Sequence, residues 1–208
     1  VGGLVVISCE FLAAHFLKVQ SYGLYASGLM VARIGEAIAV FGLPVAICHF
    51  IPVFRSNSQR AQVVGTVFAV ALLPLLIGGG FAVLLWFLAP WLARNVFHDD
   101  AVEPFIQVLA LAIPFMASTE VLGSVTRGFG YAKYYVIVKN LAAPVVFLAL
   151  LGLLIHFNGL PIWITAAVLF AHGLAFAVAI LAVIRVAGPD LWQVRPVFGF
   201  GNLYRFSS

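Results

Sequence analysis

Charge is the scarcest property of this sequence. Of its 208 residues only 9% are Asp, Glu, Lys or Arg, whereas 64% are hydrophobic, and the mean hydropathy is +1.14. A soluble domain of ordinary composition carries about 25% charged residues, so this chain has too few charges to cover the surface of a soluble particle. The composition therefore excludes a soluble globular protein and indicates an integral membrane protein.

Cysteine and catalytic motifs are equally scarce. The two cysteines, Cys9 and Cys48, lie inside apolar segments and form neither a disulfide framework nor a metal-binding spacing. The sequence "GGG" at 78–80 lacks the Lys-Ser/Thr of a nucleotide-binding loop, so it is typical of close packing or of a flexible point. We expect no enzymatic activity, no cofactor and no metal, and the basic charge balance requires no nucleic acid.

What the sequence does contain is a series of long apolar runs. A membrane helix needs about 20 apolar residues, and the runs predict an all-α transmembrane bundle. About six spans are expected, at about 1–17, 22–53, 61–90, 102–126, 140–156 and 161–184. The proline of "FGLP" at 41–44 lies inside the second span, where we expect a kink.

The chain is expected to be part of a longer protein. It begins inside an apolar run and stops at "NLYRFSS". We therefore predict one six-helix lobe over 1–186, followed by a cytoplasmic connector over 187–208 that leads into a seventh helix.

The distribution of basic residues predicts the orientation in the membrane. Eight of the eleven Lys and Arg residues fall after the even-numbered spans, against two after the odd-numbered ones. Short loops rich in Lys and Arg face the cytoplasm, so a multi-pass protein of the cell (inner) membrane is expected, with these eight on the cytoplasmic side. The eight are Arg55, Arg60, Arg127, Lys133, Lys139, Arg185, Arg195 and Arg205.

Two opposite charges lie near the middle of the second span. A charge at the bilayer centre costs about 2.5–3.5 kcal/mol on insertion scales, and such residues usually face a cavity or a partner. Arg33 and Glu36 are three residues apart, which places both on one face of a helix, where they can pair. They form either a sealed structural pair or part of a polar cavity.

Other ionisable residues lie at membrane depth. Glu10 on the first span needs a partner or a proton, and together with Arg33 and Glu36 it predicts a polar cavity near the midplane. Glu120 near the end of the fourth span either bonds to a neighbouring helix or reaches the interface. His172 in the sixth span, like His15 and His49, is interpreted first as a packed, hydrogen-bonded histidine.

Several segments resemble a known family. "HFLKVQSYGLYASGLMVARIGEAIAVFGLPVAICHFIPVF", "TRGFGYAKYYVIVKN" and "LYRFSS" are similar to the first two helices, the loop between helices four and five, and the entry to helix seven of the polysaccharide-export and oligosaccharide flippase family. The resemblance implies the N-terminal six-helix lobe of a two-lobe transporter. Such a transporter moves lipid-linked oligosaccharide across the membrane by alternating access.

The resemblance also implies roles for particular residues. Arg33 matches a cavity cation that holds the diphosphate of the substrate, and a guanidinium offers forked donors to phosphate. His15 stands where many members have an arginine, which places a second phosphate contact in doubt. Glu10, Glu36, Glu120 and His172 would balance the cavity charge or couple transport to an ion. The implied partners are the bilayer, the lipid-linked oligosaccharide and the absent C-terminal lobe.

Two alternatives remain open at this stage. One is a cation-coupled multidrug or small-molecule antiporter of the same superfamily, which would use Glu10 and Glu36 as proton or sodium sites. A cavity dominated by carboxylates, with Arg33 fully paired, would favour it, whereas a net cationic cavity would favour the flippase. The other alternative is a membrane scaffold subunit without a cavity.

Overall fold

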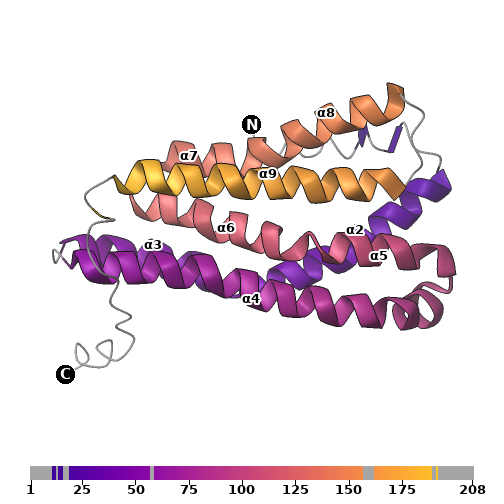
Figure 1. Cartoon of the computed structure of the whole chain (residues 1–208), viewed down its shortest axis with the longest axis horizontal. Coiled ribbons are helices and arrows are strands. Elements are labelled where there is room, and N and C mark those ends of the chain that lie inside the picture. The colour runs from indigo at the N-terminus through magenta and orange to yellow at the C-terminus, as the bar shows by residue number, and fades with distance from the viewer. Residues whose placement is uncertain are drawn as a thin grey trace.

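The chain forms a bundle of long helices that run approximately side by side (Figure 1). The computed structural model describes residues 11–12, 14–15, 19–56, 59–156, 162–188 and 191. All regular secondary structure in these residues is helical, which confirms the all-α prediction. Most of the first predicted span, including Glu10, lies outside the described residues.

The helices follow one another with short connections. Their bounds are α2 Val19–Val40, α3 Leu43–Ser56, α4 Arg60–Leu92, η1 Ala93–Phe97, η2 Asp100–Val102, α5 Glu103–Ala110, α6 Ile113–Gly128, α7 Ala132–Ile137, η3 Val138–Ala142, α8 Ala143–His156 and α9 Ile162–Ala187. Here η1 and η3 are π-helical turns, and η2 is a 3₁₀ turn.

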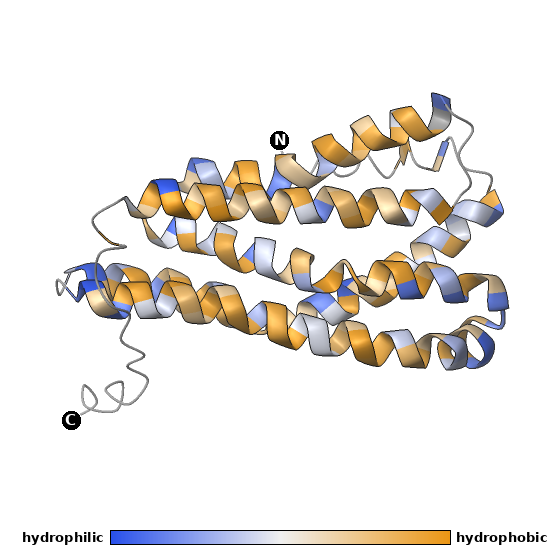
Figure 2. Ribbon diagram, viewed as in Figure 1, coloured by the Kyte–Doolittle hydropathy of each residue, from blue (hydrophilic) through white to orange (hydrophobic). Residues whose placement is uncertain are grey.

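Four helical stretches in the described part are long and apolar enough to cross a membrane. They are Val19–Ser56, Arg60–Phe97, Ala132–Leu154 and Ile162–Ala187. A fifth candidate is the broken pair of α5 and α6, which bends by 41°. Hydrophilic residues gather at the two ends of the bundle (Figure 2), as expected for a helical membrane protein.

The helix breaks have local causes in proline and glycine. Between α2 and α3, Gly42 has φ of 71°, a left-handed conformation that glycine adopts without steric penalty. Pro44 then lies in the first turn of α3, where its missing N–H costs no helical hydrogen bond. The helix is therefore interrupted at the predicted "FGLP" segment. Pro114 plays the same part in the first turn of α6.

Helix α6 is the central element of the bundle. It lies between α4 and α9 (Figure 1) and also packs against α2 and α3. Its buried side chains include Ser118, Thr119, Ser124 and Thr126. Thr119, Ser124 and Thr126 donate to carbonyl oxygens of α6 itself, over 2.7, 3.1 and 2.7 Å. Small side chains that bond within their own helix let neighbouring helices approach closely.

A stripe of small residues fixes the rotation of α2. Gly28, Ala32, Gly35 and Ala39 are all buried and repeat at helical spacing. A Cβ atom on Gly28 would lie 3.1 Å from the backbone carbon of Phe105, so α2 is in close contact with α5. Because this face points at α5 and α6, the neighbouring face with Arg33 and Glu36 points elsewhere. Arg33 and Glu36 line a cavity together with residues of α6, η3, α8 and α9.

The three consecutive glycines of α4 play unequal parts. A Cβ atom on Gly78 would lie 2.8 Å from the Cα of Pro114 at the start of α6, whereas Gly79 and Gly80 have no neighbour within 4 Å of such an atom. Close packing, one of the two sequence interpretations, therefore applies to Gly78.

We expect Gly78→Ala to lower the free energy of unfolding by about 1–3 kcal/mol, because the new methyl group overlaps backbone that cannot rotate away. Gly79→Ala is the matched control, since its methyl group meets open space and alanine favours a helix over glycine by about 1 kcal/mol. Thermal unfolding of both purified variants in detergent measures the difference. Equal stability of the two variants would contradict the close approach of α4 to α6.

Candidate functional site

A polar cavity of about 420 Å³ lies between α2, α6, α9 and the segment formed by η3 and α8. Charged side chains of both signs line its wall within candidate membrane-spanning helices. The charged and polar lining residues are Tyr25, Arg33, Glu36, Thr119, Glu120, Lys139, Asn140 and His172.

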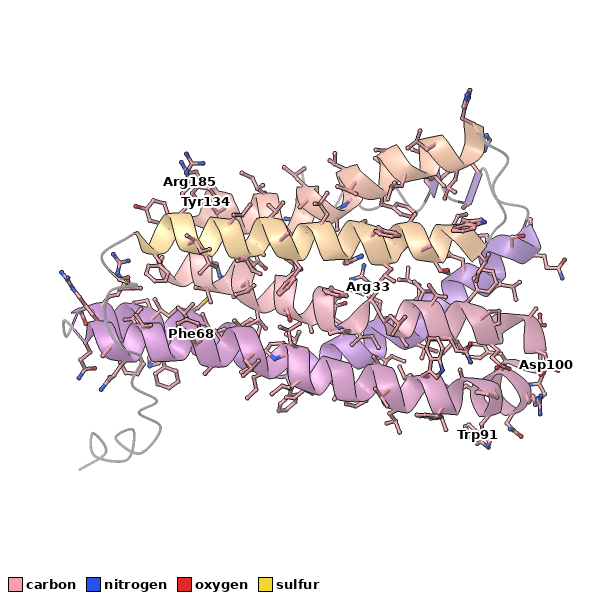
Figure 3. The ribbon with its side chains drawn as sticks, in the orientation of Figure 1. Arg33, Phe68, Trp91, Asp100, Tyr134 and Arg185 are labelled. Carbon is pink, nitrogen blue, oxygen red and sulfur yellow. The ribbon has the colours of Figure 1, made fainter. Side chains whose placement is uncertain are left out.

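The first charged pair of the cavity comes from α2. Arg33 Nη1 donates to Glu36 Oε2 over 3.0 Å, as the three-residue spacing predicts. The arginine side chain is 51% exposed and the glutamate 18%. Arg33 lies between α9 and the α5–α6 segment in Figure 3. The pair is therefore open to the cavity and is not sealed between helices.

The second charged pair joins two segments that are distant in sequence. Lys139 Nζ donates to Glu120 Oε1 over 2.7 Å, with side-chain exposures of 41% and 18%. The carboxylate of Glu120 on α6 thus bonds to a neighbouring helix, which was one of its two predicted environments. The ammonium group also lies 5.5 Å from the centre of the Tyr135 ring, within reach of a cation–π contact.

The prediction that Lys139 lies in a loop is wrong, whereas its cytoplasmic side stays a prediction. The residue belongs to the π-helical turn η3 within the candidate span Ala132–Leu154. The charged and aromatic letters of "YAKYYVIVKN" resemble an interfacial loop. The segment is nevertheless helical, and the ammonium group of Lys139 within it bonds to the carboxylate of Glu120 on α6.

His172 contributes a hydrogen-bonded imidazole from α9. Its Nδ1 lies 2.9 Å from the carbonyl oxygen of Val168. Because a carbonyl oxygen only accepts, Nδ1 carries the proton in this contact. The interpretation as a packed histidine is therefore confirmed, and the residue also lines the cavity.

The structure gathers most, but not all, of the predicted site residues. Arg33, Glu36, Glu120 and His172 line the same cavity. His15 is exposed and is not part of the lining, and Glu10 lies outside the described residues. The substrate-binding role of His15 therefore stays a prediction.

Three polar lining residues were missed by the sequence interpretation. Tyr25 lies eleven residues before Glu36, about three full helical turns away and therefore on the same face, so helical spacing would have found it. Thr119 and Asn140 carry no such signal, because their directions depend on how α6 and η3 pack.

The charges of the cavity balance. Two cations, Arg33 and Lys139, face two carboxylates, Glu36 and Glu120. The described lining is therefore neither net cationic nor dominated by carboxylates. The side chains of Arg33 and Lys139 are 51% and 41% exposed, so an anion that enters the cavity can reach both cations.

The fold and this site define a class, that of helical membrane proteins with a charged internal cavity. The model of the polysaccharide biosynthesis protein family matches residues 9–205. The chain belongs to that family. No curated protein and no solved structure gives a significant match.

We expect Glu120→Gln and Lys139→Met each to lower the free energy of unfolding. In the double variant the decrease should be smaller than the sum of the two single decreases, with a coupling energy of about 1 kcal/mol. Each single change leaves a partly buried charge or dipole without its partner. Thermal unfolding in detergent of the unmodified protein, the two single variants and the double variant gives this double-mutant cycle.

The exposed pair of Arg94 and Asp100 is the matched control for this cycle. Its atoms are 3.1 Å apart, with side-chain exposures of 68% and 73%, so its coupling energy should be smaller. Equal coupling in the two cycles would contradict a stabilising role for the cavity pair.

Proposed function

We propose that this chain is one lobe of a transporter that moves a lipid-linked oligosaccharide across the cell (inner) membrane. The family membership supports a role in polysaccharide biosynthesis. The observation that carries the proposal is the half-exposed guanidinium of Arg33 on the wall of a cavity within membrane-spanning helices. A charge within the membrane is costly, and one that faces a cavity is typical of a binding site.

The ligand group that the cavity suits is a diphosphate. A guanidinium presents planar, forked N–H donors to phosphate oxygens, and an ammonium group adds a compact positive charge. Arg33 and Lys139 supply one of each. In the proposed cycle, phosphate oxygens replace Glu36 and Glu120 as partners of these cations. Both cations are therefore paired in either state, and the two carboxylates face the open cavity while the substrate is bound.

The size of the cavity supports the presence of a second lobe that completes it. A volume of about 420 Å³ lies within the range of small-molecule sites, about 300–1,000 Å³. That space suits the diphosphate group, whereas an oligosaccharide requires more. The proposal therefore includes a second lobe of the same protein that completes the cavity, with the lipid tail remaining in the bilayer.

The proposed cycle is transport without a covalent step. The lobes alternate between openings to the two sides of the membrane, and the cavity charges hold and release the anionic group. The distribution of basic residues supports loops after the even-numbered spans on the cytoplasmic side, where the substrate would enter.

A cation-coupled antiporter is the second candidate function. The observation that favours it is the balanced lining, in which Glu36 and Glu120 are both only 18% exposed. Two partly buried carboxylates next to cations could take up and release protons or sodium ions during exchange. The flippase and the antiporter differ in whether Arg33 binds the transported molecule directly.

The first test is substitution of Arg33 in the full-length protein, with surface polysaccharide as the measurement. We expect Arg33→Ala to lower export about tenfold or more, since contacts with charged groups contribute about 1.5–3 kcal/mol. Arg33→Lys should retain part of the activity, because it keeps the charge but loses the forked geometry. Membrane abundance of each variant is the control.

The double variant Arg33→Ala, Glu36→Ala separates binding from structure. If Arg33 holds the substrate, the double variant remains as defective as Arg33→Ala. Full export by the double variant would instead identify the pair as a structural one and would remove Arg33 from the proposed site.

The antiporter candidate is tested by Glu36→Gln and Glu120→Gln, alone and together, in vesicles with an imposed proton or sodium gradient. If the carboxylates couple transport to a cation, the double variant loses the dependence on the gradient. For the flippase we expect the gradient response, where there is one, to be unchanged by these substitutions. Both glutamines are close in size to the glutamates they replace, so the cavity shape is preserved.

A further inference from the structure

A second polar hollow lies at the end of the bundle where α3 ends and α4 begins. Its volume is about 330 Å³. The polar lining consists of Arg55, Gln59 and Arg60. The remaining lining is apolar, from α4, α9 and the segments next to them: Val63, Phe129, Val186, Ala187 and Leu191. None of these residues belongs to the lining of the central cavity.

Arg55 is held in position at this hollow. Its Nη1 donates to the carbonyl oxygen of Phe129 over 3.0 Å, and its guanidinium carbon lies 5.2 Å from the centre of the Phe129 ring. These two contacts fix the side chain from one side. The planar guanidinium has five N–H donors, so it can bind a phosphate oxygen while it keeps the contact with Phe129. Arg60 is exposed and adds a second positive charge.

An apolar groove continues from the polar hollow along the bundle. It has a volume of about 430 Å³ and is formed by α4, α6 and α9. All of its lining side chains are apolar: Val67, Phe68, Ala71, Leu122, Ile180, Val183 and Ile184. Phe68, which is 49% exposed, is labelled on α4 in Figure 3. Both flanking helices are candidate membrane spans.

The hollow and the groove follow one another along the same two helices. On α4, Val63 lines the hollow and Val67 lines the groove, and these residues are one turn apart on one face. On α9, Val183 lines the groove and Val186 lines the hollow, again one turn apart. The two features are therefore neighbours, about one helical turn apart on both helices, and together they present a cationic end and an apolar length.

The dimensions of this surface fit one leaflet of a bilayer. From Arg60 to Ala71 the helix rises about 16 Å, at about 1.5 Å per residue. Half of the hydrocarbon core of a bilayer is about 15 Å thick. An amphiphile whose phosphate lies at the arginines can thus extend an acyl chain along the whole groove.

We propose that this surface binds an anionic phospholipid, with its phosphate at Arg55 and Arg60 and one acyl chain in the groove between α4 and α9. Charge complementarity selects the headgroup, and the uninterrupted apolar lining selects a lipid over a soluble anion. With the predicted orientation, the lipid comes from the cytoplasmic leaflet. The site is separate from the transport cavity, so the inference does not depend on the proposed function.

The test measures lipid retained by the purified full-length protein. Protein is incubated with vesicles of phosphatidylglycerol or of phosphatidylcholine in mild detergent, repurified, and its bound lipid is quantified by mass spectrometry. We expect phosphatidylglycerol to be preferred, and Arg55→Gln, Arg60→Gln to lower its retention about tenfold, the effect expected when contacts with a charged group are lost. Arg60→Gln alone, which leaves the Arg55–Phe129 contacts intact, should show part of this loss.

Two control variants separate the site from general effects. Arg185→Gln removes an exposed arginine at the same end of α9 that lines neither the hollow nor the groove, and it should retain the lipid as the unmodified protein does. Ala71→Trp fills the groove without changing charge and should also lower retention. Val83→Trp, at a 60% exposed position of α4 outside the groove, should not.

Three results would overturn the proposal. The first is equal retention by all variants, and the second is equal binding of glycerol phosphate, which lacks a tail. The third is unchanged lipid retention together with new protease cleavage between residues 189 and 208 in Ala71→Trp, which would assign the groove to the chain's own connector. Surface polysaccharide in the same variants is a separate readout, so failure of the lipid site and failure of the transport proposal are distinguishable.

Discussion

The close approach of α2 to α5 and α6 determines where the charges of this bundle lie. Gly28, Ala32, Gly35 and Ala39 form a face without large side chains. Even a Cβ atom on Gly28 would lie 3.1 Å from the backbone carbon of Phe105, so a larger side chain there would not fit. Once that face is buried, helix geometry directs Arg33 and Glu36 toward η3, α8 and α9. A large side chain in the stripe would rotate α2 or move it away, and the central cavity would change with it.

The position of the charges is tolerated because each cation has a carboxylate within 3.0 Å. An isolated charge at this depth would cost about 2.5–3.5 kcal/mol, and pairing removes much of that cost. Pairing alone, however, does not require exposure to a cavity. A pair that only stabilises the bundle is better replaced by apolar side chains of similar volume. The half-exposed Arg33 and Lys139 are therefore more consistent with binding than with a structural role.

Features that depend on a single helix could be predicted from the sequence. Composition predicted the all-α membrane bundle, the three-residue spacing predicted the Arg33–Glu36 pair, and "FGLP" predicted the interruption of the second span. Features that depend on packing against a second helix could not. Lys139 resembles a loop residue until Glu120, nineteen positions earlier, is known to face it. Likewise, nothing in "GGG" distinguishes Gly78 from its neighbours, because Pro114 of another helix makes the difference.

The two cationic regions of the bundle differ in how their charge is compensated, and this difference separates their roles. In the central cavity, two carboxylates balance two cations, so an anion must compete with Glu36 and Glu120 and can leave again. At the end of the bundle, Arg55 contacts the carbonyl oxygen and the ring of Phe129, and no carboxylate lines that hollow in the described part of the chain. A site without a competing carboxylate favours a resident anion. Under the two proposals, arginine serves reversible binding on α2 and a resident lipid at the α3–α4 end of the bundle, because the surrounding side chains differ.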